Sequence, residues 1–200
     1  MYIARILYPV KTLGPGNRIG IWVAGCCHHC KGCSNPELWE KQEKYWTELE
    51  QVVYMVNSIV AKNPVDGFTI TGGDPFEQPE ALQVLLPELK PISEDILVYT
   101  GYKYEEIKDR YAEILGNISV IIDRPYIDEL NQGEALRGSI NQNIIILKSD
   151  YSEIYNSYIE ENQGLIQNFY TPTGVISVGI HRPGYEQELD MKLTEKGLER

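Results

Sequence analysis

The sequence predicts an α/β protein with a parallel sheet that is curled or partly closed as a barrel. Short apolar segments alternate along the chain with amphipathic segments of helical periodicity, and most of the apolar segments end in glycine or small polar residues. Strands that alternate with helices pair in parallel through right-handed crossovers. In such folds ligands bind where the carboxyl ends of the strands meet, so we expect the functional residues in those loops.

The composition is that of a globular chain with one hydrophobic core. Its 200 residues are 42% hydrophobic and 24% charged, without a low-complexity tract. The first residues lack the pattern of a secretion signal, and no apolar run approaches the roughly 18 residues that span a bilayer. We therefore expect a cytoplasmic protein with no membrane partner. The formal net charge of −11 would repel phosphates, which argues against nucleic acid as a partner.

The expected elements follow from periodicity and from helix signals. Strands are expected at residues 19–24, 68–71, 96–100, 118–122 and 143–147. Thr47 and Glu50 predict a capping box at the start of the first helix. Pro79 predicts the first turn of the second helix. Because proline disfavours a helix interior, Pro87 leaves two interpretations of where this helix ends, before or after it. A third helix is expected over residues 107–115, with its apolar side chains facing the core.

The pattern changes in the last quarter of the chain. A tyrosine-rich helix is expected near residues 152–161, followed by a hairpin turning at residues 171–174, a loop that contains His181, and a charged tail. We therefore interpret residues 1–147 as the core domain and residues 148–200 as a small α+β extension packed on it.

All four cysteines lie within eight residues, from Cys26 to Cys33, so no distant partner is available for a disulfide. In a reducing compartment such clustering favours metal or redox chemistry. Cys26, Cys30 and Cys33 have the spacing CxxxCxxC and could give three thiolates to a 4Fe-4S cluster, which has four irons to ligate. The remaining iron would be open to a small chelating molecule. S-adenosylmethionine (SAM) can bind there through its amino and carboxylate groups.

Two alternatives are open at the cysteine segment. A set that begins at Cys27 instead of Cys26 has the spacing CxxCxxC, which also occurs in ferredoxins. His28 and His29 could complete a closed zinc site with the thiolates. A closed zinc site would not explain the glycine-rich segment roughly forty residues further along the chain.

Six sequence elements occur in a characteristic order within residues 1–147. They are Gly14-Pro15-Gly16-Asn17-Arg18, Gly25-Cys26 with Cys30-Lys31-Gly32-Cys33-Ser34-Asn35, Thr71-Gly72-Gly73-Asp74-Pro75, Tyr99-Thr100-Gly101-Tyr102, Ile122-Asp123 with Pro125-Tyr126, and Arg137-Gly138-Ser139 with Asn141-Gln142. With these elements and similar gaps, the sequence resembles the radical SAM activases of glycyl-radical enzymes. Within that family it is most similar to those that serve anaerobic ribonucleotide reductases.

The resemblance implies a partial, open radical-SAM-type (β/α) barrel and assigns the site residues. The cluster ligands and catalytic centre are assigned to Cys26, Cys30 and Cys33. The residues that bind SAM are assigned to Gly72, Gly73 and Asp74, which receive its amino group, and to Thr100, Asp123, Ser139 and Asn141, which line its pocket. An alternative for the last four is structural, because short polar residues at strand ends also cap helices and form turns.

The resemblance also implies an activity and its partners. The protein would cleave SAM reductively to a 5′-deoxyadenosyl radical and install a glycyl radical in a partner, an anaerobic ribonucleoside-triphosphate reductase. The electron would come from a flavodoxin- or ferredoxin-like reductant. Because the family's members end soon after the Asn-Gln element, residues 148–200 leave two alternatives open. One is a radical SAM enzyme that acts on another protein, a peptide or a small molecule, and the other is a non-catalytic metal-binding or electron-transfer module.

Overall fold

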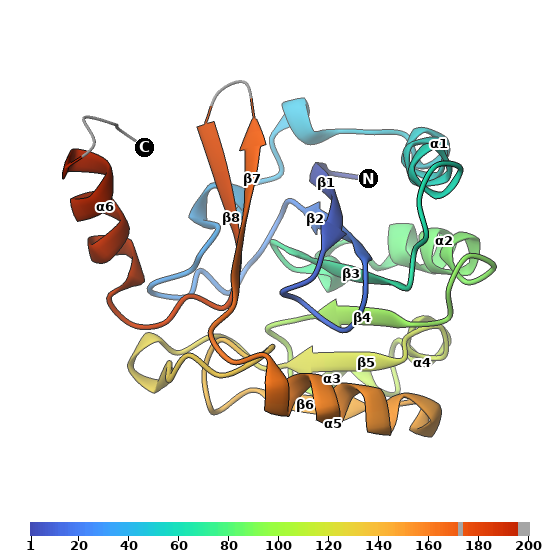
Figure 1. Cartoon of the computed structure of the whole chain (residues 1–200). Helices are drawn as coiled ribbons and strands as arrows, with labels where there is room; N and C mark the ends of the chain where they lie inside the picture. The colour runs from blue at the N-terminus through green and yellow to red at the C-terminus, as the bar shows by residue number, and fades with distance from the viewer. Residues whose placement is uncertain (172–173, 196–200) are drawn as a thin grey trace.

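A six-stranded sheet runs through the molecule in the order β1-β2-β3-β4-β5-β6 (Figure 1). The computed structural model describes residues 1–171 and 174–195. The strands are β1 (Ile3–Val10), β2 (Arg18–Val23), β3 (Gly67–Gly72), β4 (Ile96–Tyr99), β5 (Val120–Asp123) and β6 (Asn143–Ile146). Strands β2 to β5 pair in parallel, whereas β1 and β6 pair antiparallel at the two edges. The predicted α/β class is confirmed.

The two edge strands differ from the sequence-based expectation. Strand β1 was not predicted, because Arg5 and Pro9 interrupt its apolar pattern and most of its residues are only half-buried. Strand β6 was expected at the right place, but the expectation of parallel pairing is wrong there. Between β5 and β6 the chain forms only a single short turn of 3-10 helix, Asp128–Leu130, and a parallel pairing needs a longer crossover.

Four helices accompany the sheet in the first two thirds of the chain. They are α1 (Leu49–Val60), α2 (Pro79–Leu89), α3 (Tyr104–Ile107) and α4 (Ala112–Leu115). The third predicted helix is thus divided into two short ones. The predicted capping box at α1 is wrong, because Thr47 exchanges backbone hydrogen bonds with Met1 at 2.9 Å and is drawn into an extended pairing, which leaves Glu48 as the N-cap.

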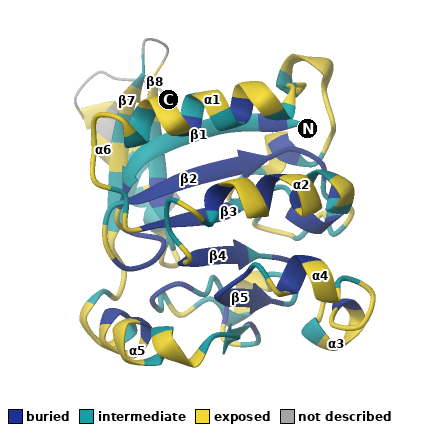
Figure 2. Ribbon diagram, turned by 90° about the vertical axis from the view of Figure 1, so that its right-hand side faces the viewer, coloured by how far each residue is buried: buried dark blue, intermediate teal, exposed yellow. Residues whose placement is uncertain are grey.

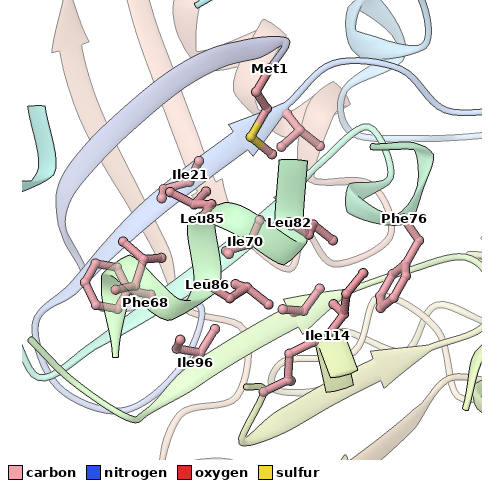
Figure 3. Packing of buried hydrophobic residues seen from close by; sticks show 14 of the residues in the cluster. Met1, Ile21, Phe68, Ile70, Phe76, Leu82, Leu85, Leu86, Ile96 and Ile114 are labelled. Atoms are coloured by element: carbon pink, nitrogen blue, oxygen red, sulfur yellow. The ribbon is translucent and has the colours of Figure 1, made fainter. Parts of the chain in front are cut away.

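The strands alternate their side chains between two covered faces. Ile19 and Ile21 of β2 point to the face covered by α1, α2 and α4, whereas Trp22 points to the opposite face. Figure 2 shows these helices lying across one face of the sheet. The core on that side is built from leucines of α2 packed on strand residues such as Phe68 and Ile70 (Figure 3). Because both faces are covered, the central strands are apolar on both sides.

The C-terminal extension covers the other face of the sheet. Helix α5 (Ser152–Glu161) packs Tyr155 against β4 and β5, and the hairpin of β7 (Ile166–Thr171) and β8 (Gly174–Gly179) packs Val178 against β1 and β2. Helix α6 (Tyr185–Glu195) lies beyond the hairpin (Figure 1). The predicted helix and hairpin are present, but the hairpin's turn residues 172–173 and the tail residues 196–200 lie outside the described residues.

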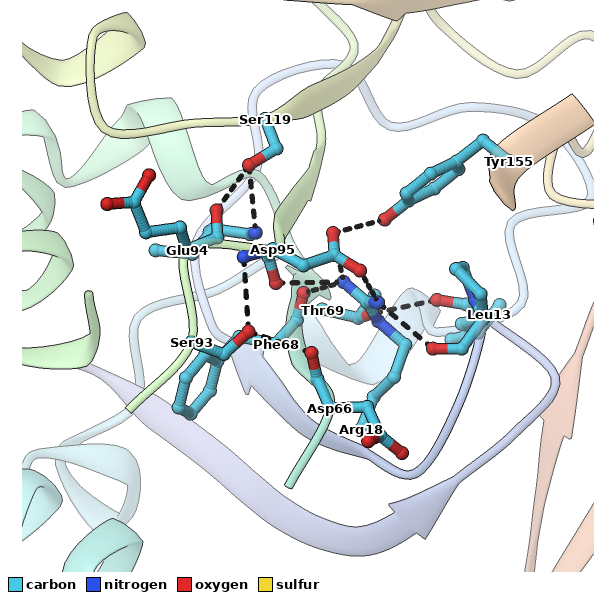
Figure 4. Close-up of polar contacts among 12 residues, drawn as sticks. Leu13, Arg18, Asp66, Phe68, Thr69, Ser93, Glu94, Asp95, Ser119 and Tyr155 are labelled. Carbon is cyan, nitrogen blue, oxygen red and sulfur yellow. Dashed lines mark hydrogen bonds and ion pairs between the residues drawn. The ribbon is translucent and has the colours of Figure 1, made fainter. Parts of the chain in front are cut away.

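A buried ion pair ties this extension to the sheet. Arg18 of β2 is 0% exposed and donates to Asp95 at 2.6 Å, just before β4 (Figure 4). Tyr155 of α5 donates its hydroxyl hydrogen bond to the same carboxylate at 2.7 Å. Arg18 also donates to Thr69 of β3 at 2.8 Å, so the guanidinium connects β2 to β3 and, through Asp95, to the start of β4 and to α5. A buried charge is tolerated only with such complete pairing.

Among the described residues, no helix combines the length and the apolar character needed to cross a lipid bilayer.

Candidate active site

The cysteine segment follows β2 and opens into a large cavity at the carboxyl ends of the parallel strands. The segment is anchored by backbone hydrogen bonds from Gly25 to Leu38 at 2.8 Å and from Cys26 to Trp39 at 2.9 Å. The cavity has a volume of about 1280 Å³, and the residues that line it include Cys26, Cys30 and Cys33. The structure therefore brings together the three cysteines that the sequence selected.

Cys27 faces a different direction. It is exposed and is not among the residues that line this cavity in the described chain. Its thiol lies 3.3 Å from the hydroxyl of Tyr102, which also lies 2.6 Å from a carboxylate oxygen of Glu77. Hydrogen bonding to Cys27 and Glu77, aided by burial, raises the pKa of Tyr102 above its ordinary value. This geometry favours the CxxxCxxC set that begins at Cys26.

The glycine loop after β3 lies directly against the cysteine segment. The amide of Gly73 donates to Val23 at 2.7 Å, and the amide of Asp74 donates to Gly25 at 2.7 Å. Gly72 has a φ of 111°, which side-chain-bearing residues rarely adopt, and a Cβ at Gly73 would collide with the carbonyl oxygen of Gly25. Both glycines are therefore required for this close backbone approach, and both line the cavity.

The side chain of Asp74 connects three loops through hydrogen bonds. Its buried carboxylate accepts hydrogen bonds from Phe76 at 3.0 Å, from the Thr100 hydroxyl at 3.0 Å and from the Gly101 amide at 2.8 Å. His28 of the cysteine segment lies 2.9 Å from the same carboxylate. Both carboxylate oxygens are thus occupied by protein partners. The sequence did not predict the contact with His28, because it joins residues 46 positions apart.

The two histidines of the cysteine segment contact other side chains. The hydrogen bond to Asp74 raises the pKa of the His28 imidazole, although partial burial works against this shift. The ring of His29 packs against that of Trp39 in a tilted arrangement, with a centroid distance of 4.8 Å and an interplanar angle of 37°. Within the described chain, no three His, Cys, Asp or Glu side chains form a group that could hold a metal ion. These contacts do not favour the zinc alternative.

The donor set fits a cluster better than a single ion. A 4Fe-4S cluster binds each thiolate to a different iron, so its ligands stand further apart than those of one metal ion. Burial raises the pKa of the Cys26 thiol to about 11, and burial also raises the pKa of Cys30. These thiols would release protons on binding iron, because thiolates are the ligating form. The three cysteines, on one loop that faces a cavity, fit a cluster site.

The remaining predicted SAM residues fall into two groups. Thr100 lines the cavity and is bonded to Asp74. Asp123, Ser139 and Asn141 are not among the residues that line the cavity in the part of the chain that the structure describes. Asp123 accepts from Tyr104 at 2.9 Å, Ser139 accepts from the Ile127 amide at 3.1 Å, and Asn141 donates to Pro125 at 2.9 Å. These bonds connect segments that are 12 to 19 positions apart in the chain, which is a structural task like the alternative that the sequence left open.

Much of the cavity wall comes from residues that sequence reasoning did not select. All six residues of β8 line it, as do Tyr170 of β7 and several residues between Gly179 and Lys192. Trp22 of β2 and Tyr126 of the loop after β5 contribute aromatic surface. The segment from Gly179 to Gly184 was noticed only as a loop containing His181, and no local signal placed it near the cysteines.

Comparisons with known proteins identify the family of this chain. A family model described as a 4Fe-4S single cluster domain matches residues 12–145. The anaerobic ribonucleoside-triphosphate reductase-activating protein of Enterobacteria phage T4 is 34% identical over 143 residues, which cover 69% of this chain and 90% of that protein. The proteins of the same name from Vibrio cholerae and Escherichia coli (strain K12) are 33% and 31% identical, each over 68% of this chain and 92% of their own length. The chain therefore belongs to the family of anaerobic ribonucleoside-triphosphate reductase-activating proteins with a 4Fe-4S single cluster domain.

Proposed function

We propose that this protein is a radical SAM activase that installs a glycyl radical in an anaerobic ribonucleoside-triphosphate reductase. The observation that carries the proposal is that Cys26, Cys30 and Cys33 share one cavity with Gly72 and Gly73. The names of the related proteins support the choice of partner. The consecutive strand order with helices along one face is compatible with the open barrel that the resemblance implies.

The chemistry follows from the three-thiolate donor set. When bound, a 4Fe-4S cluster with one iron free of protein ligands supplies an electron to the sulfonium of SAM, which breaks the bond to C5′ and gives methionine and a 5′-deoxyadenosyl radical. That radical would take a hydrogen atom from a glycine α-carbon of the partner, which would leave a glycyl radical there and give 5′-deoxyadenosine. A flavodoxin- or ferredoxin-like protein would supply the electron.

Each group of residues has a separate task in this proposal. Cys26, Cys30 and Cys33 hold the cluster. Gly72 and Gly73 present backbone carbonyls to the SAM amino group, and their lack of side chains lets this loop pack closely against β2 and the cysteine segment. Asp74 fixes the glycine loop to the cysteine segment through His28 and to the loop after β4 through Thr100, instead of offering a free carboxylate. Asp123, Ser139 and Asn141 hold the neighbouring loops in place.

The experiment compares adjacent cysteines in the anaerobically purified protein after reconstitution with iron and sulfide. We expect Cys30→Ala to lose the visible absorbance of the cluster and the formation of 5′-deoxyadenosine from SAM under reducing conditions. Cys27→Ala is the matched control and should keep both, because its thiol is exposed and lies outside the cavity. The reverse pattern would overturn the ligand set. A reconstituted wild type that forms no 5′-deoxyadenosine would leave only the non-catalytic alternative.

A second measurement tests the partner. Mixing the reduced protein, SAM and the purified reductase should produce a glycyl radical signal in electron paramagnetic resonance. Formation of 5′-deoxyadenosine without that signal would favour the alternative in which another protein, peptide or small molecule is the acceptor.

A further inference from the structure

The β7–β8 hairpin and α6 lie beyond residue 145, where the family match ends, yet they line the same cavity as the cysteines. Strand β8 lines the cavity along its whole length, from Gly174 to Gly179. The related proteins cover only 68–69% of this chain while being matched over 90–92% of their own length. This wall of the cavity is therefore an addition to the part of the chain that the family shares.

The hairpin is held firmly against the sheet. The Thr12 hydroxyl donates to the carbonyl of Val178 at 2.9 Å, and the Gln167 side chain bridges β7 to the end of β1, donating to Pro9 at 2.6 Å and accepting from Lys11 at 2.9 Å. On the same side, Val178 is buried against the cluster that contains Trp22. A hairpin fixed in this way can position a partner, because the hairpin loses little conformational entropy when the partner binds.

The other side of the hairpin presents a strand edge and exposed side chains that no described strand covers. Strand β8 pairs with β7 and with no other strand among the described residues. Tyr170 and Val175 are cross-strand neighbours that both line the cavity, and they are 85% and 56% exposed. An open strand edge offers main-chain hydrogen bonds to an extended peptide, and an exposed aromatic side chain beside it offers apolar contact.

The position of β8 in the cavity also points to a polypeptide. The same cavity is lined by β8 and by the cysteine segment, so a chain that lies along β8 shares a cavity with Cys26, Cys30 and Cys33. A small substrate would need neither an exposed strand edge nor an aromatic rim.

We propose that β8, together with the rim pair Tyr170 and Val175, is a docking strip for an extended segment of the polypeptide that this protein activates. The segment adds to the edge of β8 through main-chain hydrogen bonds and covers the two exposed side chains. This inference rests on the proposed function and extends it, because it assigns partner recognition to a part of the chain outside the family match.

The test measures binding of the full-length, anaerobically reconstituted protein to the purified anaerobic reductase encoded in the same genome, immobilised for biolayer interferometry. We expect Tyr170→Ala/Val175→Ala to raise the dissociation constant about tenfold or more. Tyr170→Phe should keep near-wild-type affinity, because the ring and not the hydroxyl makes the contact. Circular dichroism and iron content verify that the variants are folded and loaded.

The chain offers a matched control for the double variant. Tyr54 of α1 and Val84 of α2 are 72% and 55% exposed and are not among the described residues that line the cavity. The variant Tyr54→Ala/Val84→Ala removes similar exposed groups and should bind the reductase as the wild type does. An equal loss of affinity in both double variants would overturn the proposal.

The remaining outcomes separate this inference from the proposed function. If the wild type cleaves SAM but the Tyr170→Ala/Val175→Ala variant binds the reductase normally, the docking strip is wrong and the function stands. If the wild type binds through the strip but forms no 5′-deoxyadenosine, the function is wrong and the strip stands. An undetectable wild-type complex would overturn the strip. The strip would also be overturned if sedimentation showed that the double variant abolishes only self-association, because a second copy of this chain would then occupy β8.

Discussion

Asp74 shows how one residue can combine a predicted site with a structural task. From the sequence it was a SAM residue, because the family resemblance assigned it to the loop that receives the SAM amino group. In the structure its carboxylate accepts from Thr100 and Gly101 and pairs with His28, so three loops depend on it. The loop remains a candidate for SAM, while the carboxylate acts by holding the loops together.

Replacing Asp74 by asparagine tests this task in the protein without added iron. The amide would turn one nitrogen donor toward groups that are themselves donors, so we expect the free energy of unfolding to fall by about 1–3 kcal/mol. Urea denaturation followed by circular dichroism measures the change. Asp109→Asn, at an exposed position, is the control and should alter stability by less than about 0.5 kcal/mol. Equal stability of both variants would show that the hydrogen bonds of Asp74 do not stabilise the fold.

The ion pair of Arg18 and Asp95 allows a graded comparison at the residue scale. Asp95→Asn removes the negative charge and leaves a fully buried guanidinium without its counterion, so we expect a loss of about 3–5 kcal/mol. Tyr155→Phe removes only one hydrogen bond to the carboxylate and should cost about 1.5–3 kcal/mol. Chemical denaturation gives both values. A greater loss in Tyr155→Phe than in Asp95→Asn would contradict this order.

At the scale of elements, pairing with distant residues explains most of the departures from the sequence pattern. Thr47 is a good N-cap by type, but its backbone pairs with Met1 and the helix begins later. Strand β1 forms despite its irregular pattern, because β2 offers it an antiparallel edge, with which it pairs through two register shifts. Local propensity is a weak preference that such long-range pairing overrides.

Helix α2 continues through Pro87 to Leu89, whereas the sequence did not decide whether the helix ends at this proline. Proline supplies no amide hydrogen for the helix and is unfavourable in a helix by up to about 3 kcal/mol relative to alanine. Because Pro87 is exposed, its replacement removes no core contact. We expect Pro87→Ala to raise the free energy of unfolding by about 1–2 kcal/mol, since restriction of the unfolded chain by proline offsets part of the gain. Thermal or urea denaturation would detect this gain, which Glu88→Ala should not produce.

At the scale of the whole molecule, the extension is part of the core. Helix α5 contributes Tyr155 and Tyr158 to one buried cluster, and β8 contributes Val178 to another. These clusters include Trp22 and Leu97 of the central strands. The domain boundary at residue 147 therefore stays a prediction. The residues on its two sides pack together in the same buried clusters.

Truncation tests whether residues 1–147 can stand alone. Each large apolar side chain returned to water costs about 1.5–3 kcal/mol, and a native domain is stable by only about 5–15 kcal/mol. We expect the 1–147 chain to lose cooperative unfolding and to bind the dye ANS, which reports exposed apolar surface. Truncation after Gly184 is the control. It removes α6, whose described residues belong to none of the three buried clusters, and should leave unfolding cooperative. Cooperative unfolding of the 1–147 chain with unchanged stability would mark an independent domain.

The sequence by itself determined the α/β class and the positions of five of the six sheet strands, and it predicted the cysteine set and the glycine loop as the site. These features depend on neighbours in the chain: alternation of apolar residues, the spacing of Cys26, Cys30 and Cys33, and the absence of side chains at Gly72 and Gly73. Only the tertiary structure decided the direction of β6, the contact of His28 with Asp74, and the cavity wall formed by β8. These depend on contacts between residues far apart in the chain, which leave no regular spacing in the sequence.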